Sequence, residues 1–421
     1  MDDNWSSNLP AGFVWNCVSR LGSESRPDAI QNLRLVCKPW CAEITGSVTS
    51  GTYVAGRCSP MWLTLPKLKR LRRLTVGEAD GDLVLAEVKL AKSVLPLLES
   101  VSFRGCSLED SPIPMSSALQ GISELSLVDC RLPASTHLWF LESLTSLTIR
   151  IIPGRDDYYD DVETDLKRGV VLISGLRSLT LSFVDLVEWE FGMLTRLESL
   201  DLLCCEIVND GIREIGQIRS LKRLSLQSCN NVTDAGMLYL PCSLETLDVR
   251  NSVRIETTAW LPRLDRLSSL SITVCEEEDV DAKLGRIRRL DSLHVEVEAN
   301  QLSEEAIAAM SRQTNITSMD LRIRFVSCKS VDIRGHIASS LVSLMCSWCT
   351  DTDEFMRGLS GCSSLAKIRL QFCSHLTDAG LERLPGSLKR IVVDTCYGVT
   401  ADGVQKLRDR IPGLEVVTNC I

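Results

Sequence analysis

The amino-acid sequence predicts an α/β solenoid, in which short parallel strands form a curved sheet with helices on its convex side. Three observations predict this fold class. A frame of aliphatic and cysteine residues recurs along most of the chain, each copy contains a short period-two alternation, and the copies follow one another at nearly constant spacing. A small group of helices at residues 1–48 is expected to precede the repeating part.

The composition is that of a globular protein with an acidic balance. Of the 421 residues, 44% are hydrophobic and 24% are charged, and the formal net charge is −9. An acidic chain lacks the basic surface that binds phosphate backbones, so we expect no nucleic acid as partner. No stretch reaches the roughly 18 consecutive apolar residues of a membrane span, and the N-terminus resembles neither a secretory signal nor a transit peptide. We therefore expect a soluble protein of the cytoplasm or the nucleus, or of both.

Residues 1–48 are expected to form two or three short helices. The first helix carries an apolar stripe at helical spacing that includes Val14, Val18 and Leu21. The second begins at Asp28, directly after Pro27, and Pro39 bends or ends it. By physical reasoning alone, such helices could simply cap the first repeat, because the ends of a solenoid need covering.

The repeating part occupies residues 67–421 and follows a linker or first-repeat cap at 49–66. Its clearest copy runs from Leu365 to Cys373 in the frame L-x-x-L-x-L-x-x-C, and L-T-D-A-G-L follows it. Further copies begin at Leu71, Leu98, Ile122, Leu144, Leu176, Leu197, Leu221, Leu244, Leu267, Leu290, Ile316, Leu341, Leu388 and Leu414. There are about 15 copies, and most of them lie about 21–27 residues apart. This is the period of leucine-rich repeats.

Each copy is predicted to be one strand followed by a turn and a helix. The two aliphatic residues of L-x-L point inwards and the residues beside them point outwards, because side chains alternate along a strand. The D-A-G-L-x-x-L segment indicates the turn and the helix. One copy cannot bury its apolar face alone, whereas stacked copies form a continuous core between a concave sheet and convex helices.

Eight of the 18 cysteines occupy one position of the frame, three residues after the second strand aliphatic, which we call the slot. They are Cys106, Cys130, Cys205, Cys229, Cys275, Cys349, Cys373 and Cys396. A periodic position predicts reduced thiols that pack in the core. Cys346 and Cys349 have the spacing of half a zinc site, but Cys346 is an inward strand residue and no second pair follows, so we predict no metal.

The N-terminal segment also resembles a known motif. Leu9-Pro10 and Val36-Cys37-Lys38-Pro39-Trp40, with the Val18 and Leu21 stripe between them, resemble an F-box. Together with the repeats, they make the chain similar to F-box/LRR proteins of the cysteine-containing repeat subfamily. The resemblance implies docking on a Skp-family adaptor of a cullin complex. The residues that it divides between the motif's core and the adaptor-binding surface are Leu9, Pro10, Val14, Val18, Leu21, Leu33, Val36 and Trp40.

The frame also predicts which side chains line the concave sheet, namely those beside and between the two strand aliphatics. The cationic members and the single histidine are candidate substrate-binding residues: Arg104, Arg150, Arg223, Arg250, His294, Arg322, Lys367, Arg369 and Arg390. No aromatic residue occurs at these positions, so we expect a polar interface that is steered by charge. The alternative is a solvated face without a partner.

One insertion interrupts the spacing of the repeats between Leu144 and Leu176. Residues 155–165 are acidic and carry two tyrosines. Such a run is typical of a solvated loop. A contact with a basic partner, or with the concave face, is the alternative.

We predict that the chain is not an enzyme and has no cofactor. The four histidines are scattered, and no nucleophile elbow, P-loop, H-E-x-x-H or paired C-x-x-C occurs. The predicted function is that of a substrate-recognition adaptor in an SCF-type cullin-RING E3 ubiquitin ligase, which binds a protein substrate of unknown identity. The alternative is an LRR scaffold unrelated to ubiquitin ligases, in which residues 1–48 only cap the solenoid. A solenoid that holds a small molecule is a third alternative.

Overall fold

The computed structural model describes residues 50–54, 70–77, 88, 92–93, 95–108, 115–132, 138, 141–151, 169–275, 290–298, 318–324, 336–350 and 352–419. The chain divides into two compact units, unit 1 within residues 1–184 and unit 2 within residues 185–421. The N-terminal helices predicted at 1–48 and the acidic insertion at 155–165 lie outside the described residues. Of the helices that are described, none has the length and apolar character needed to cross a membrane.

The described part of unit 1 contains six strands, and each pairs in parallel with the next one along the chain. They are β1 (Ser50–Val54), β2 (Arg73–Gly77), β3 (Ser100–Arg104), β4 (Glu124–Val128), β5 (Ser146–Arg150) and β6 (Ser178–Ser182). Helix α6 (Met115–Ala118) lies between β3 and β4 in the chain. This strand order is the one that stacked repeats predict.

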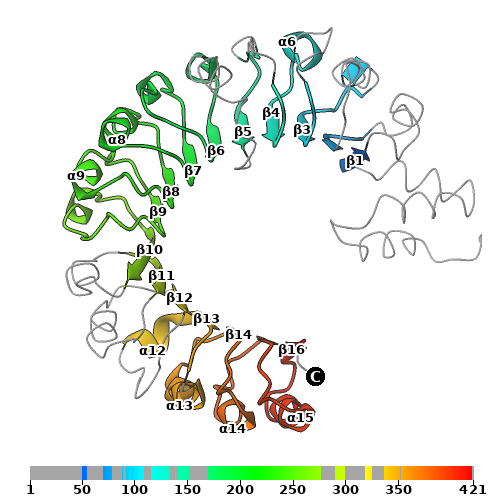
Figure 1. Ribbon diagram of the computed structural model, residues 1–421, viewed down its shortest axis with the longest axis vertical. Helices are drawn as coiled ribbons and strands as arrows, with labels where there is room; N and C mark the ends of the chain where they lie inside the picture. The colour runs from blue at the N-terminus through cyan, green and yellow to red at the C-terminus, as the bar shows by residue number, and fades with distance from the viewer. Residues whose placement is uncertain are drawn as a thin grey trace, which may run out of the picture. The chain divides into compact units, whose positions relative to one another are not determined.

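The described part of unit 2 continues the same pattern with ten parallel strands in chain order. They are β7 (Ser199–Leu203), β8 (Arg223–Gln227), β9 (Thr246–Val249), β10 (Ser269–Cys275), β11 (Ser292–Glu298), β12 (Ser318–Arg324), β13 (Leu341–Ser347), β14 (Lys367–Gln371), β15 (Arg390–Asp394) and β16 (Glu415–Thr418). The connections contain η4 (Phe191–Met193), α8 (Asn209–Ile215), α9 (Asp234–Met237), η5 (Leu261–Arg263), α12 (His336–Ser340), α13 (Thr352–Gly358), η6 (Leu359–Gly361), α14 (Asp378–Leu381) and α15 (Ala401–Arg410). In Figure 1, α8 and α9, like α13 to α15, lie on the side of their repeats away from the strands.

The core of each unit consists of the aliphatic positions of the frame. In β8, Leu224 and Leu226 are buried, while Arg223 is exposed. Large aromatic side chains fill the helical side where the connection has only a 3-10 turn. Trp260, which directly precedes η5, is 1% exposed. The side chains of Trp189 and Phe191 are both buried and stack on each other before β7.

The parallel sheet begins earlier than the frame predicts. Strand β1 lies inside residues 49–66, which we expected to be a linker or first-repeat cap, and it pairs with β2 from Ser50 to Val54. Its sequence, SGTYV, has no L-x-L pair. The frame does not predict β1, because β-pairing needs only an extended backbone and a neighbouring strand and does not need leucine.

A left-handed residue follows the strand and precedes the slot in most described copies. The residues with positive φ at this position are Gly105, Asp129, Phe183, Cys204, Ser228, Asn251, Trp348, Phe372 and Thr395. In Gly105, Asp129, Cys204, Ser228, Trp348 and Phe372 the backbone N–H donates to a backbone carbonyl of the next repeat. For example, Ser228 donates to the carbonyl of Arg250 at 3.0 Å. The left-handed step turns the chain inwards, so that the slot residue enters the core.

The slot cysteines with described side chains are all buried, which confirms the predicted core position. Each described slot thiol donates to the carbonyl of the residue two positions before it, as Cys229 does to Gln227 at 3.6 Å. Ser252 takes the same place after β9, where its hydroxyl bonds to the carbonyl of Leu226. Cys346 is buried within β13, as predicted, and no group of metal-binding side chains occurs among the described residues.

The slot thiol of Cys229 is expected to react much more slowly with alkylating reagents than exposed thiols. Burial raises the pKa of the Cys229 thiol to about 12 and that of Cys362, a buried cysteine outside the slot, to about 11. Because the thiolate is the reactive form, we expect iodoacetamide to modify Cys229 at least about a hundredfold more slowly than the exposed Cys242 at neutral pH. Peptide mass spectrometry of the native chain measures both rates. Equal rates would contradict the burial of the slot, and denatured protein provides the control.

Hydrogen bonds from side chains at the start of one helix to the start of the next join successive repeats on the helical side of unit 2, and we call this series the cap ladder. The Asp378 carboxylate, in the first turn of α14, accepts hydrogen bonds from the backbone N–H and the hydroxyl of Thr400 at 2.8 and 2.7 Å. Thr400 is the N-cap of α15. The same link joins Asp353 to Thr377 one repeat earlier. Asn209 bonds to Thr233, and Asp234 to the backbone of Thr257, in the same way.

A glycine at the third position of α9, α14 and α15 makes room for the ladder. A Cβ atom on Gly403 would overlap the Asp378 carboxyl, and one on Gly380 would overlap that of Asp353. A Cβ on Gly236 would meet Asn209 in the same way. The T-D-A-G sequence thus does more than start a helix. It provides an N-cap, a carboxylate for the next repeat, and space for the carboxylate of the previous one.

Candidate protein-binding surface

The outward side chains of the strands form a continuous surface in unit 2, which we call the strand face. Parallel pairing places equivalent residues side by side, so the strand face consists of rows that run across the sheet. The middle row contains Asp201, Ser225, Asp248, Ser271, His294, Asp320, Ser343, Lys367, Arg390 and Glu415. The row therefore begins with acidic residues and has its cations on β14 and β15.

A second row lies two residues further along each strand. It contains Thr273, Glu296, Arg322, Met345, Arg369, Val392 and Val417. On β14, Arg369 has Met345 and Val392 as its neighbours on either side. The charge of Arg369 thus stands between two apolar residues.

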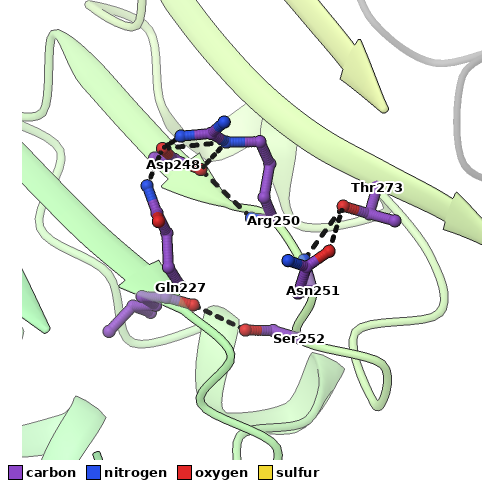
Figure 2. Close-up of polar contacts among 7 residues, drawn as sticks. Gln227, Asp248, Arg250, Asn251, Ser252 and Thr273 are labelled. Atoms are coloured by element: carbon purple, nitrogen blue, oxygen red, sulfur yellow. Dashed lines mark hydrogen bonds and ion pairs between the residues drawn. The ribbon is translucent and has the colours of Figure 1, made fainter. Parts of the chain in front are cut away.

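Arg250, one of the predicted substrate-binding residues, is held by Asp248. Its Nε and Nη2 atoms donate to the Asp248 carboxylate at 3.0 and 2.7 Å, and Gln227 donates to the same carboxylate at 2.6 Å (Figure 2). The hydrogen bond with Asp248 raises the pKa of Arg250, and the charges of Glu296 and Asp201 raise it further. The side chains of the Arg250–Asp248 pair are 20% and 15% exposed, so this cation is engaged within the chain.

The turn after β9 is fixed by its own hydrogen bonds. Asn251 has a positive φ, its backbone N–H donates to the Thr273 hydroxyl at 2.9 Å, and that hydroxyl donates to the Asn251 side chain at 3.2 Å (Figure 2). Ser252 points the other way, to the carbonyl of Leu226. These bonds hold Arg250 and its ion pair at the end of the strand face.

The other predicted substrate-binding residues divide between the two units. Arg104 and Arg150 end β3 and β5 of unit 1, and both are exposed. In unit 2, Lys367, Arg369 and Arg390 lie exposed on the adjacent strands β14 and β15. Arg223 is exposed on β8, several strands away, with His294 half-buried on β11 and Arg322 on β12. All eight predicted adaptor-binding residues, from Leu9 to Trp40, lie outside the described residues.

The cations of β14 and β15 differ from Arg250 in their partners. In the described part of the chain, Lys367 and Arg369 have no ion pair or side-chain hydrogen bond. Arg390 forms a 3.7 Å ion pair with Glu415 in which both side chains are at least half exposed. Exposed pairs of this kind contribute about 0–1 kcal/mol, so all three cations are available to an acidic partner.

Two aromatic residues beside these cations were missed by the prediction of a polar face. Trp348 and Phe372 follow β13 and β14, and their rings stack at 4.3 Å between centroids. They occupy the left-handed position before the slot, which the frame does not count as part of the sheet face. The sequence signal that finds them is the residue directly before each slot cysteine.

The comparisons with known proteins agree with this architecture. A family model described as Leucine Rich repeat matches residues 217–240. The TLR13 structure of a TLR13–ssRNA13 complex is 15% identical, with a TM-score of 0.55, and the match covers 89% of this chain and 53% of that chain. This chain therefore spans about half the length of that protein.

Two further solved structures are similar over most of their length. A Rad7 and Elc1 complex from yeast matches with 18% identity and a TM-score of 0.44, covering 97% of this chain and 98% of that chain. An internalin from Listeria monocytogenes matches with 15% identity and a TM-score of 0.42, covering 93% and 94%. The repeat match and the parallel-strand architecture together identify the fold of this chain as a leucine-rich-repeat solenoid, a fold that presents a surface for binding proteins.

Proposed function

We propose that this chain is the substrate-recognition subunit of an SCF-type cullin-RING E3 ubiquitin ligase. Residues 1–48 dock on a Skp-family adaptor in this proposal, and the strand face of the solenoid binds a protein substrate. The chain itself carries out no catalysis. It brings its substrate close to partner enzymes, so its contribution to the reaction is proximity. The cytoplasm or the nucleus is the compartment for such a role.

The observation that carries the recognition half of the proposal is the strand face of unit 2. Polar and charged side chains stand in rows on a parallel ladder, half-buried from Asp201 to His294 in the middle row and exposed at Lys367, Arg369 and Arg390. Lys367 and Arg369 have no ion pair in the described part of the chain. Rigid elements hold binding groups more precisely than loops. The adaptor half rests on the F-box resemblance of Leu9-Pro10 and Val36-Cys37-Lys38-Pro39-Trp40.

Co-purification of the full chain with a tagged Skp-family adaptor tests the adaptor half. We expect the wild-type chain to be captured, and Trp40→Ala to weaken capture at least about tenfold, because large aromatic residues dominate such contacts. Tyr397→Ala, at an 82% exposed position in unit 2, is the control that should leave capture unchanged.

The alternative function is an LRR scaffold outside ubiquitin ligases, whose N-terminal helices only cover the first repeat. This alternative predicts that the adaptor does not capture the chain, and that Trp40→Ala changes only the denaturation midpoint of the protein. That combination of results would refute the ligase proposal and leave the protein-binding role of the solenoid in place.

A further inference from the structure

Two aromatic side chains lie on the surface at the ends of β13 and β14. Trp348 is 52% exposed and Phe372 is 39% exposed. Their rings are nearly parallel, with an angle of 8° between their planes. Large aromatic side chains are normally buried more completely than this, so a stacked and half-exposed pair marks a contact surface.

The fold does not require aromatic residues at these two positions. Both have positive φ, 60° for Trp348 and 55° for Phe372, a conformation that is unfavourable for bulky side chains. Other repeats place Gly105, Asp129 or Asn251 there, which tolerate it better. The chain thus keeps two large rings exposed in a strained conformation, and an outlier of this kind suggests a function.

The cations lie on β14 and β15, and the aromatic pair follows β13 and β14. Arg369 precedes Phe372 by three residues, which is about 10 Å along an extended strand. Lys367 and Arg390 are direct neighbours in the middle row. The nearby Asp394 carboxylate accepts hydrogen bonds from Gln371, Thr395 and Asn419, all of them neutral donors.

We propose that Trp348, Phe372, Lys367, Arg369 and Arg390, the β13–β15 patch, bind an extended acidic segment of a partner protein that carries an aromatic or large aliphatic side chain. Carboxylates of the segment would pair with the cations, and its apolar side chain would pack on the stacked rings. This inference rests on the proposed protein-recognition function, but it does not depend on adaptor docking.

An acidic peptide fits this patch better than a nucleic acid does. Aromatic rings and arginines can also stack on bases and bind phosphates. However, the chain carries a net charge of −9, and the middle row continues from the patch towards Asp320, His294 and Asp248. A long polyanion would meet the carboxylate of Asp248 in this row, whereas a short acidic segment need only cover β13 to β15.

Asparagine variants separate binding from folding. Trp348→Asn and Phe372→Asn remove the rings but place at each position a residue that Asn251 already supplies in its own repeat. We expect their denaturation midpoints to be equal to or above the wild-type value, because the left-handed strain is relieved. Arg369→Glu reverses one cation without touching the turn, so it tests the patch even where an asparagine variant is less stable.

Selection of random dodecapeptides displayed on phage, with the full chain as bait, tests the proposal. We expect enrichment of peptides that combine Asp or Glu with an aromatic or large aliphatic residue. Recovery should fall at least tenfold on Phe372→Asn and on Arg369→Glu. Matched controls are Arg383→Glu, an exposed cation after α14 and outside the strand face, and Tyr239→Asn, an exposed aromatic residue after α9. Both controls should retain the peptides.

Several results would overturn the proposal. They are selection of basic or neutral peptides, no enrichment over bare support, equal recovery on the patch variants, and stronger patch-dependent binding of oligouridylate than of any selected peptide. Adaptor capture, measured on the same preparations, separates the two proposals. A chain that captures the adaptor but selects no acidic peptide refutes the patch alone, whereas the reverse result refutes adaptor docking alone.

Discussion

Replacing Gly403 with alanine is expected to lower the free energy of unfolding of unit 2 by about 3 kcal/mol. The new Cβ would overlap the Asp378 carboxyl, which holds the backbone N–H and the hydroxyl of Thr400. Moving the carboxyl away breaks both bonds at the start of α15. In an ordinary helix the same substitution stabilises by about 0.5–1 kcal/mol, so the sign of the change is itself diagnostic.

A double-mutant cycle with Asp378→Ala identifies the cause of this loss. Asp378→Ala alone should cost about 1–2 kcal/mol, because it removes a cap from the next repeat. In the double variant the overlap is gone, so the total should be clearly smaller than the sum of the two single losses. Chemical denaturation followed by circular dichroism measures all three variants. Strict additivity would contradict a contact between the two residues.

Gly386→Ala is the matched control for the glycine substitution. Its Cβ would meet no atom within 4 Å. We expect its free energy of unfolding to stay within about 0.5 kcal/mol of the wild-type value. A loss at Gly386 as large as at Gly403 would mean that the effect is not specific to the overlap with the cap ladder.

The strands could be predicted from the sequence because their signal is local. Leu224 and Leu226 stand two residues apart, and that spacing alone determines which side of the strand is buried. The cap ladder is different, because Asp378 and Thr400 are 22 residues apart and meet only when the repeats stack. The T-D-A-G letters predicted a helix start, but the partner of the carboxylate depends on the stacking distance between repeats.

The candidate site could be predicted only in part, for two physical reasons. Arg250 was predicted to line the sheet face, but the structure places it after β9 and pairs it with Asp248, whose carboxylate is also held by Gln227 of β8. Trp348 and Phe372 were missed because backbone preferences argue against bulky residues with positive φ. Local backbone preferences alone therefore do not predict which residues stand at these two positions.

Replacing Trp260 with alanine is expected to lower the free energy of unfolding of unit 2 by about 3–5 kcal/mol. The indole is 1% exposed, and it fills the helical side of a repeat whose connection contains only the 3-10 turn η5. Its Nε1 also donates to the carbonyl of Thr257 at 2.8 Å, and the backbone N–H of Thr257 bonds to Asp234 of the previous repeat. The substitution would therefore open a cavity and loosen one step of the ladder.

Trp260→Phe separates these two contributions. It keeps most of the apolar volume but leaves the Thr257 carbonyl without its donor, so we expect a loss of about 1–3 kcal/mol, smaller than that of the alanine variant. Tyr397→Ala, which removes an 82% exposed ring, should change stability by less than about 0.5 kcal/mol. Denaturation midpoints of the three variants show whether the losses of stability follow this order, with Trp260→Ala the largest and Tyr397→Ala the smallest. If Trp260→Ala lowered the free energy of unfolding no more than Tyr397→Ala does, packing of the indole on the helical side would not stabilise this repeat. Its stability would then come from the strands alone.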